Sequence, residues 1–399
     1  MVEELFFQLI QVAIGTRTIL SAVPTAEEWV EIYETAKKQA VVGICFAGVE
    51  RLPKEQLPPP RMIRQWAVKA DRIKDENAGL NKECVQVSRF FGKYGFETCI
   101  LKGQSNYANY PEWLQGLRTP GDIDIWIRPK DEESLSDTQR QALADHQLTI
   151  SSKRPVRSAI EFCQRVKKGE YVYYHNLDFP VLQKTPVEVH YRPTFLYCMW
   201  RNRRLQKWIS SFCLNTSDTK SPINRRSMQY NDFTIAPLEF NVVFQLLHLY
   251  KHIFEEGIGL RQLLDYYFVL NAARDLPRPE ILKIIKSLNL SDFCGAVMNV
   301  MREVFALEEE VMLCEPNTKK GGVLLNEILI GGNFGKYDER YNWADVTNGS
   351  MDYRGADYAV TRFKHNYRFL SSYPEEVLWE PFFRIYHMLW RKLKLWRYE

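Results

Sequence analysis

The sequence predicts an α+β protein in which a sheet-containing module lies between helical regions. Apolar residues recur at helical spacing through residues 1–96. Short alternating runs typical of strands follow up to residue 193, and helical spacing returns after residue 235. We therefore divide the chain into four parts: an N-terminal helical region (1–96), an α/β module (97–235), a helical domain (236–330), and a linker with a C-terminal amphipathic helix (331–399).

The helices of the first part are predicted from their ends. Thr25 and Glu28 form a capping-box pattern before a helical run. The three prolines at 58–60 interrupt the chain. A second run, from Arg61 to about Tyr94, keeps helical spacing until Gly95 ends it.

The second part contains the predicted strands. These are the runs 97–103, 121–127, 171–183 and 185–193, of which the second reads GDIDIWI. Residues 131–147 are polar and predict an exposed helix between the second and third strands.

The last part begins with residues 331–356, whose Gly, Asn and Asp content predicts a loop or linker. Residues 377–399 form a basic, aromatic amphipathic helix. Such a helix could contact a membrane or nucleic acid. We favour packing of its aromatic residues on the body of the protein, with the Lys and Arg side chains extending into solvent.

Charge and cysteine content limit the classes of function. The 399 residues carry a formal net charge of +4, which permits a polyanionic partner but argues mildly against long nucleic acid. None of the eight cysteines forms a C-x-x-C pair, so we expect buried thiols in a reducing cytoplasm. The N-terminus lacks the charge pattern of a signal peptide, and no apolar run of membrane-spanning length occurs. A cytoplasmic protein without a transmembrane segment is predicted.

The strand GDIDIWI contains two acids in an apolar run. Side chains alternate along a strand, so Asp122 and Asp124 share one face, about 7 Å apart, and the isoleucines share the other. We expect only the isoleucine face to be buried. Two neighbouring carboxylates repel each other, and a divalent cation would relieve this repulsion. The alternative is an edge strand whose acids face water.

A third acid, Glu188, lies between two valines in the last predicted strand. If that strand lies beside GDIDIWI, Glu188 completes a three-carboxylate cluster able to hold two metal ions. His190 and Arg192 share its face. Glu188 could instead pair with Arg192 or another base. His190 could be a metal-adjacent or acceptor-facing group, but we expect it to be a hydrogen-bonded neighbour of the cluster.

The run LKGQS at the end of the first predicted strand could bind phosphate. The strand end presents free backbone N–H groups and the Ser105 hydroxyl, Gly103 permits close approach of a phosphate, and Lys102 could add a positive charge. Arg118 could neutralise phosphate or merely end a loop.

Two residue pairs on the later helices are expected to have structural rather than functional roles. His248 and His252 lie four residues apart on one helical face, a spacing that can bind a metal ion. The sequence offers no third metal ligand beside them, so ordinary core or surface histidines are expected. Arg261 and Asp265 are expected to form a pair within one helix.

Together, LKG, GDIDIWI and VEVHYRP resemble the nucleotidyltransferase superfamily of polymerase-β type, and more narrowly a group of uncharacterised bacterial nucleotidyltransferases. The resemblance implies a mixed sheet with helices, Asp122, Asp124 and Glu188 as catalytic metal ligands, and Mg²⁺ or Mn²⁺ as the metal. It also implies that Lys102, Gly103, Ser105 and Arg118 bind an NTP. This sequence has Gln104 between Gly103 and Ser105, where the superfamily has Gly-Gly or Gly-Ser.

The predicted function is metal-dependent transfer of an NMP from an NTP to a hydroxyl of an acceptor, with release of pyrophosphate. The acceptor could be a small molecule, a protein or RNA. Two rival functions stay open. One is a non-catalytic binding or antitoxin-like protein that keeps the fold, and the other is a hydrolase using two carboxylates as acid and base.

Overall fold

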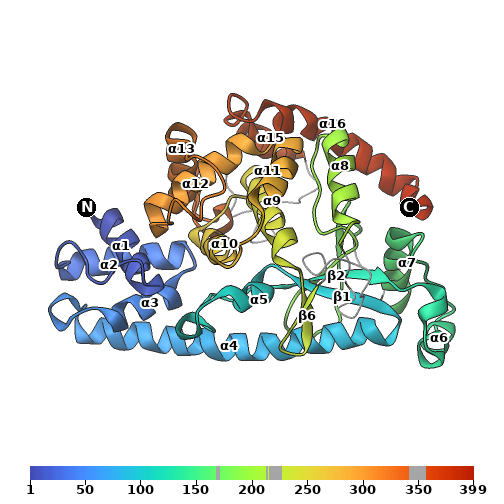
Figure 1. Ribbon diagram of the computed structural model, residues 1–399, viewed down its shortest axis with the longest axis horizontal. Coiled ribbons are helices and arrows are strands. Elements are labelled where there is room, and N and C mark those ends of the chain that lie inside the picture. The colour runs from blue at the N-terminus through green and yellow to red at the C-terminus, as the bar shows by residue number, and fades with distance from the viewer. Residues whose placement is uncertain (168–170, 213, 215–226, 341–355) are drawn as a thin grey trace. The chain divides into compact units, whose positions relative to one another are not determined.

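The computed structural model describes residues 1–167, 171–212, 214, 227–340 and 356–399 (Figure 1). It contains one six-stranded mixed sheet and many helices, which confirms the α+β prediction with flanking helical regions. The chain forms two compact units, each built from three separate segments. Unit 1 comprises Met1–Ala78, Asn109–Thr119 and Gln245–Val377. Unit 2 comprises Gly79–Ala108, Pro120–Phe244 and Leu378–Glu399.

Unit 1 is helical in its described part. The N-terminal helices pack on one another, α1 against both α2 and α3, and α12 packs against α13. Its helices are α1 (Val2–Ile14), α2 (Ala26–Lys38), α3 (Val42–Arg51), η1 (Lys54–Gln56), η3 (Glu112–Leu114), α10 (Leu260–Ala272), α11 (Arg278–Ser287), α12 (Ser291–Phe305), α13 (Thr318–Gly331), η6 (Asn333–Gly335) and α15 (Ala356–Tyr367).

Local sequence signals account for the ends of the first helices. Thr25 caps α2, and a reciprocal bond between its backbone and Glu28 completes the predicted capping box. Helix α4 (Pro60–Lys93) starts at the last of the three prolines, where a missing N–H costs nothing. It ends two residues before Gly95, whose φ of 78° suits glycine.

Unit 2 contains the sheet, whose strand order is β3-β4-β2-β1-β6-β5. The two central strands, β1 and β2, are antiparallel, whereas β2 with β4 and β1 with β6 are parallel. The outer pairs, β3 with β4 and β5 with β6, are antiparallel. The strands are β1 (Phe96–Leu101), β2 (Ile123–Pro129), β3 (Asn176–Asp178), β4 (Val187–His190), β5 (Met228–Tyr230) and β6 (Phe233–Ile235).

The helices of unit 2 connect and cover these strands, and α7 packs against β2. They are α5 (Gly103–Asn106), η4 (Glu132–Ser134), α6 (Asp137–Ala144), α7 (Pro155–Lys167), α8 (Met199–Ile209) and η7 (Leu395–Tyr398). Four further helices have residues in both units, namely α4, η2 (Tyr107–Asn109), α9 (Leu238–Glu255) and α16 (Pro374–Lys392).

Each of the four predicted strand runs contains or overlaps an observed strand, and α6 lies within the predicted exposed helix. The sequence prediction missed the hairpin of β5 and β6. A two-residue turn joins these strands, and its first residue, Asn231, has a positive φ of 44°. An Asn in a two-residue turn between alternating residues is a hairpin signal that was available in the sequence.

The prediction that β2 is buried on the isoleucine face only is wrong. Asp124 and Trp126, on the other face, are buried as well. The Trp126 ring stacks on Phe240 of α9, and Phe240 stacks in turn on Trp208 of α8. These aromatic side chains cover the second face of the strand at Trp126, while Asp124 on the same face contacts Lys102 and His190.

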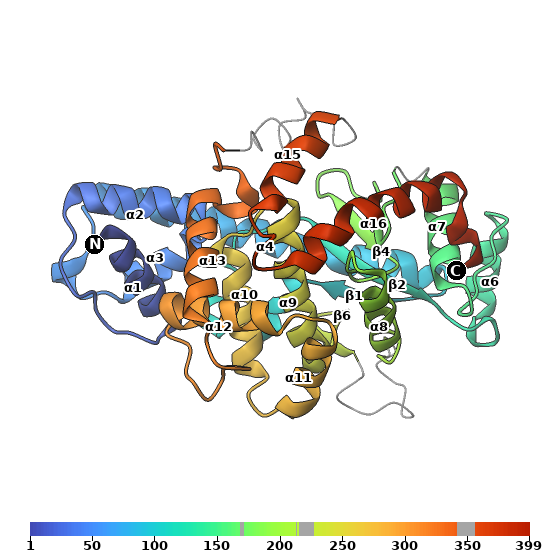
Figure 2. The same cartoon turned by 90° about the horizontal axis from the view of Figure 1, so that it is seen from above.

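The C-terminal segment packs on the sheet-containing module, as we favoured. Phe383 and Trp390 of α16 are buried against Tyr174, which precedes β3. Figures 1 and 2 both place the end of the chain beside α7, where the backbone N–H of Arg157 donates to the Glu399 carbonyl. Glu399 also forms an ion pair with Arg192, which follows β4.

Several remaining expectations concern the chain as a whole. Seven of the eight cysteines lie in the described residues, where all seven are free and six are buried; Cys213 lies outside them. Most of the predicted linker, residues 341–355, also lies outside the described residues. Among the helices that are described, none combines the length and the hydropathy needed to cross a bilayer.

Candidate metal centre

Two parallel strands bring two of the predicted acids together. Asp124 on β2 lies directly opposite Glu188 on β4, and Trp126 lies opposite His190. Isoleucines in β2 and valines in β4 alternate with these residues and favour strand structure. The register therefore places Asp124, Glu188 and His190 on one face of the sheet, which confirms that the two strands are neighbours.

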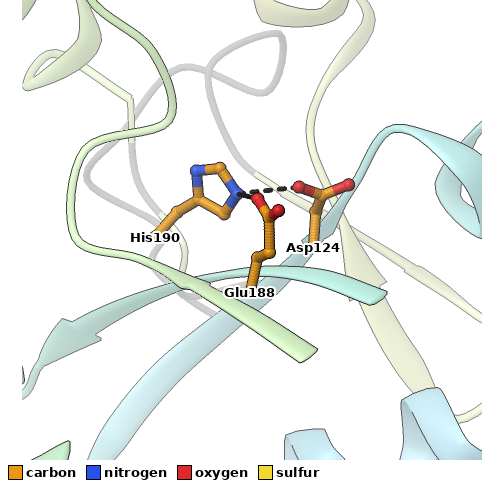
Figure 3. Close-up of side chains that lie close together, drawn as sticks. All are labelled: Asp124, Glu188 and His190. Carbon is orange, nitrogen blue, oxygen red and sulfur yellow. Dashed lines mark hydrogen bonds and ion pairs between the residues drawn. The ribbon is translucent and has the colours of Figure 1, made fainter. Parts of the chain in front are cut away.

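These three side chains converge on one another, as Figure 3 shows. His190 Nε2 lies 2.8 Å from Asp124 Oδ1 and 3.5 Å from Glu188 Oε2. One ligand atom from each of the three residues lies within 4.8 Å of the other two. No other group of three or more His, Cys, Asp or Glu with such spacing occurs among the residues that the structure describes.

The expectation that His190 is a hydrogen-bonded neighbour of the acids agrees with this geometry. Its side chain is fully buried, and its second ring nitrogen, Nδ1, has no hydrogen-bond partner within the described part of the chain. Its position two residues after Glu188 predicted a shared face but was not taken to predict a metal ligand. In a strand, that spacing places both side chains on one face.

The negative charge of the cluster is balanced by Lys102, at the end of β1. Its Nζ lies 2.7 Å from Asp124 Oδ1, the same oxygen that faces His190. Burial would lower the pKa of Lys102, but the carboxylates of Asp124, Glu188 and Asp122 outweigh this effect and raise it. The ammonium group of Lys102 is therefore charged beside the acids.

The pKa values of the two carboxylates are lowered, whereas that of Lys102 is raised. Burial would raise the pKa of Asp124, but the charge of Lys102 and the hydrogen bond from His190 hold it well below its usual range. For Glu188, burial is likewise outweighed by the His190 hydrogen bond, and its pKa is lowered. Both acids are anionic near neutral pH. Burial would lower the pKa of His190, but its bonds to the two acids raise it.

Asn176 on β3 fixes the orientation of Glu188. Its side-chain N–H donates to Glu188 Oε2 at 2.6 Å, across the antiparallel pair of β3 and β4. The sequence analysis missed this residue because the pairing of β3 with β4 is needed to bring it near the acid. Such a donor holds a ligating carboxylate in one position.

The turn after β1 carries the residues predicted to bind phosphate. Lys102 has φ 51° and ψ −150°, a conformation normally taken by glycine, at a typical cost of about 1–3 kcal/mol. The backbone N–H and the hydroxyl of Ser105 both donate to the Lys102 carbonyl, at 2.8 and 2.7 Å. Of the backbone N–H groups expected to be free at this strand end, that of Ser105 is bonded, because its bond closes the first turn of α5. Its hydroxyl oxygen can still accept a bond. Phosphate binding by Lys102, Gly103 and Ser105 stays a prediction.

Asp122 lies immediately before β2 and is exposed, in contrast to Asp124. It is not among the three residues whose ligand atoms converge, but its charge acts on Lys102. Asp122 is thus near the cluster at its solvent-facing end. Its role as a third carboxylate ligand stays a prediction.

Arg118 belongs to unit 1 and makes a buried ion pair there. Its Nε and Nη2 atoms donate to both carboxylate oxygens of Asp265 at 2.8–3.0 Å. The Tyr110 hydroxyl donates to the same carboxylate at 2.7 Å. Binding of a phosphate by Arg118 would have to compete with Asp265. This predicted role stays untested.

Other expected pairs lie in unit 1. The rings of His248 and His252 on α9 are 4.3 Å apart between centroids and belong to no three-ligand group in the described residues. Asp265, which we expected to pair with Arg261, instead holds Arg118, while Arg261 donates to the Thr119 carbonyl.

The side chains at the cluster fit a divalent cation. Asp124 and Glu188 supply anionic oxygens from neighbouring strands, and such oxygens suit Mg²⁺ and Mn²⁺. His190 Nε2 adds a nitrogen that transition metals accept. To become a ligand through Nε2, His190 would have to carry its proton on Nδ1, which has no hydrogen-bond partner in the described residues.

A comparison with protein-family profiles found a family that matches this chain. The profile of a family described as "Uncharacterised nucleotidyltransferase" matches residues 25–306, a range that includes β1, β2 and β4. Searches of curated proteins and of solved structures gave no match.

Proposed function

The chain belongs to this family of uncharacterised nucleotidyltransferases, and from that premise we propose that it transfers an NMP from an NTP to a hydroxyl acceptor with a divalent metal ion. One observation carries the proposal. Asp124 and Glu188 lie opposite each other in register, both anionic, and His190 Nε2 lies within 3.5 Å of an oxygen of each. Two neighbouring carboxylates repel each other, and a divalent cation would add positive charge to that of Lys102.

In this proposal, Asp124 and Glu188 hold the metal, Mg²⁺ or Mn²⁺, and Asp122 joins them when substrate is present. When bound, the ion would supply positive charge to the phosphates as charge develops on them. Asn176 keeps Glu188 in place by its 2.6 Å bond. Lys102 gives up part of its contact with Asp124 and turns its charge to the triphosphate.

The turn of Gly103 and Ser105 lies one residue beyond Lys102, so it is within reach of the same triphosphate. The acceptor hydroxyl oxygen bonds to the α-phosphorus and loses its proton to water. The bond from the α-phosphorus to the oxygen bridging to the β-phosphate breaks, and pyrophosphate leaves. The protein contributes positioning and charge, and no covalent intermediate is required.

Calorimetry with each of the four NTPs, with and without Mg²⁺ or Mn²⁺, tests this proposal. We expect at least one NTP to bind in a metal-dependent way. A variant with Asp124→Asn and Glu188→Gln should lose at least tenfold in affinity. Asp145→Asn, which changes the exposed C-cap acid that follows α6 in the same unit, serves as the matched control. Equal metal-dependent binding by wild type and the double variant would contradict the assignment.

A second candidate is a non-catalytic binding protein that keeps the fold. It is favoured by the observation that Asp124 Oδ1 already accepts bonds from both Lys102 and His190. Under this reading Lys102 permanently replaces the metal. The wild-type protein would then bind no NTP with either metal, and Lys102→Met would not restore binding.

A further inference from the structure

Helix α16 has an apolar face on each side. Its residues from Leu378 onward belong to unit 2. The inner face is anchored by Phe383 and Trp390, which pack with Tyr174, and Phe383 also stacks on Phe195 at 4.8 Å between ring centroids. This packing accounts for one side of the helix only.

The outer face is also apolar, and it is exposed. Its side chains recur at the spacing of a single helical stripe, which is normally polar in a surface helix. We call them the outer stripe: Leu378 (59% exposed), Phe382 (64%), Ile385 (56%), Met388 (39%), Leu389 (43%) and Leu393 (63%). A contiguous apolar patch of this kind marks a site of interaction.

The charges beside the outer stripe are positive. In Leu378–Glu399, the exposed charged residues are Lys392, Lys394 and Arg397. The two acids of this segment are engaged by bases, Glu380 by Arg384 and Glu399 by Arg192. The segment therefore presents an apolar stripe followed by a basic end.

We propose that the outer stripe and this basic end bind the surface of an anionic lipid bilayer. The helix would lie in the plane of the surface, with Phe382 and Ile385 entering the acyl boundary and Lys392 and Lys394 contacting lipid phosphates. In Figure 2, the C-terminal end of the chain lies beside α7 of its unit. The packing of Phe383 and Trp390 with Tyr174 would hold the inner face on the module while the outer face meets the lipid. This inference does not depend on the proposed function.

A second copy of the chain is a weaker occupant. A standard protein interface uses about 20 residues on each side. The outer stripe has six apolar residues on one helix, too few for a stable dimer by themselves. A bilayer needs no complementary shape, and its negative charge matches Lys392, Lys394 and Arg397.

Flotation of the purified full-length chain with lipid vesicles tests the proposal. One vesicle type contains phosphatidylcholine alone, and the other contains phosphatidylcholine and phosphatidylglycerol in equal parts. We expect binding to the anionic vesicles, weakened at least tenfold by Phe382→Gln with Ile385→Gln. The matched control is Val23→Gln with Val68→Gln, two apolar positions that are 60% and 71% exposed elsewhere in the chain; it should bind like wild type.

A charge variant separates the two parts of the site. Lys392→Gln with Lys394→Gln should weaken binding to anionic vesicles roughly tenfold, since each basic residue near the surface contributes measurably. The proposal would be overturned if the wild type bound neither vesicle type. It would also be overturned if the wild type and the stripe variant, Phe382→Gln with Ile385→Gln, bound equally well. A dimer of the wild type in light scattering that the stripe variant abolishes, without vesicle binding, would assign the stripe to a second copy instead.

Discussion

Replacing Arg118 tests whether this residue serves the fold or the nucleotide. In Arg118→Ala, the Asp265 carboxylate loses the guanidinium group that bonds to both of its oxygens. The carboxylate stays buried, since the side chains of Arg118 and Asp265 are only 6% and 3% exposed. Leaving one charge of a buried pair without its partner typically costs about 3–5 kcal/mol. Tyr110 keeps donating to Asp265 and recovers part of this loss, so we expect about 3 kcal/mol, the lower end of that range.

Urea unfolding followed by tryptophan fluorescence measures the loss. The control replaces the whole group with apolar residues of similar size: Arg118→Met, Asp265→Leu and Tyr110→Phe. This removes both charges and the hydroxyl that would lack an acceptor, so the triple variant should lie within about 1 kcal/mol of wild type. The Thr119 carbonyl, which also accepts from Arg118, keeps its bond from Arg261.

Two results would refute this reasoning. If Arg118→Ala unfolds within about 1 kcal/mol of wild type, the buried pair does not carry the stability assigned to it. If the triple variant is as unstable as the single one, an uncompensated Asp265 charge is not the cause. A stable triple variant that loses NTP binding would support the predicted phosphate role of Arg118.

Three further predictions follow from single positions. Lys102→Gly and Lys102→Ala both remove the ammonium group, but only glycine suits the positive φ of 51°. The glycine variant should therefore be more stable than the alanine variant by about 1 kcal/mol in urea unfolding. Equal stabilities of the two variants would contradict the assigned backbone strain. Burial lowers the pKa of His365 from 6.5 to about 4, so between those pH values the unfolded chain binds a proton that the folded chain does not. Stability should therefore fall as pH drops from 6.5 toward 4, by up to about 3 kcal/mol, and His365→Gln should flatten the pH profile of the melting temperature. Gly43→Ala would place a Cβ 2.3 Å from the Leu117 carbonyl oxygen and should cost about 1–3 kcal/mol, whereas Gly79→Ala meets nothing within 4 Å in a helix and should stabilise by about 1 kcal/mol. A thermal melt that ranks these two glycine variants the other way would be inconsistent with the packing.

The parts of the fold that local sequence determines were predictable. The capping box at Thr25 and the helix that begins at Pro60 depend on contacts within a few residues, and alternation alone located the runs that contain β2 and β4. The covering of the Asp124 face was not predictable in this way. It depends on Trp208 and Phe240, which come from α8 and α9, and no local pattern says that their rings reach β2.

The residues of the candidate site also differ in whether local sequence could identify them. Asp124 and Glu188 could be named from the sequences of their own strands. Their proximity could be predicted only on the condition that these two strands are neighbours in the sheet. Asn176 and the ion pair of Lys102 with Asp124 required the register between strands and the backbone of the turn. Arg118 looked available for phosphate because its partner, Asp265, lies far along the chain.

The late position of α16 in the chain has a consequence for synthesis. Phe195 and Tyr174 emerge from the ribosome early, but Phe383, which covers them, emerges only after residues 196–382 have been added. At common rates of translation this interval lasts roughly 10–40 s. During that time the strands bearing Asp124 and Glu188 can pair while the aromatic surface beside them stays uncovered. The nascent chain thus exposes an aromatic surface, prone to aggregation, in the place that α16 later occupies.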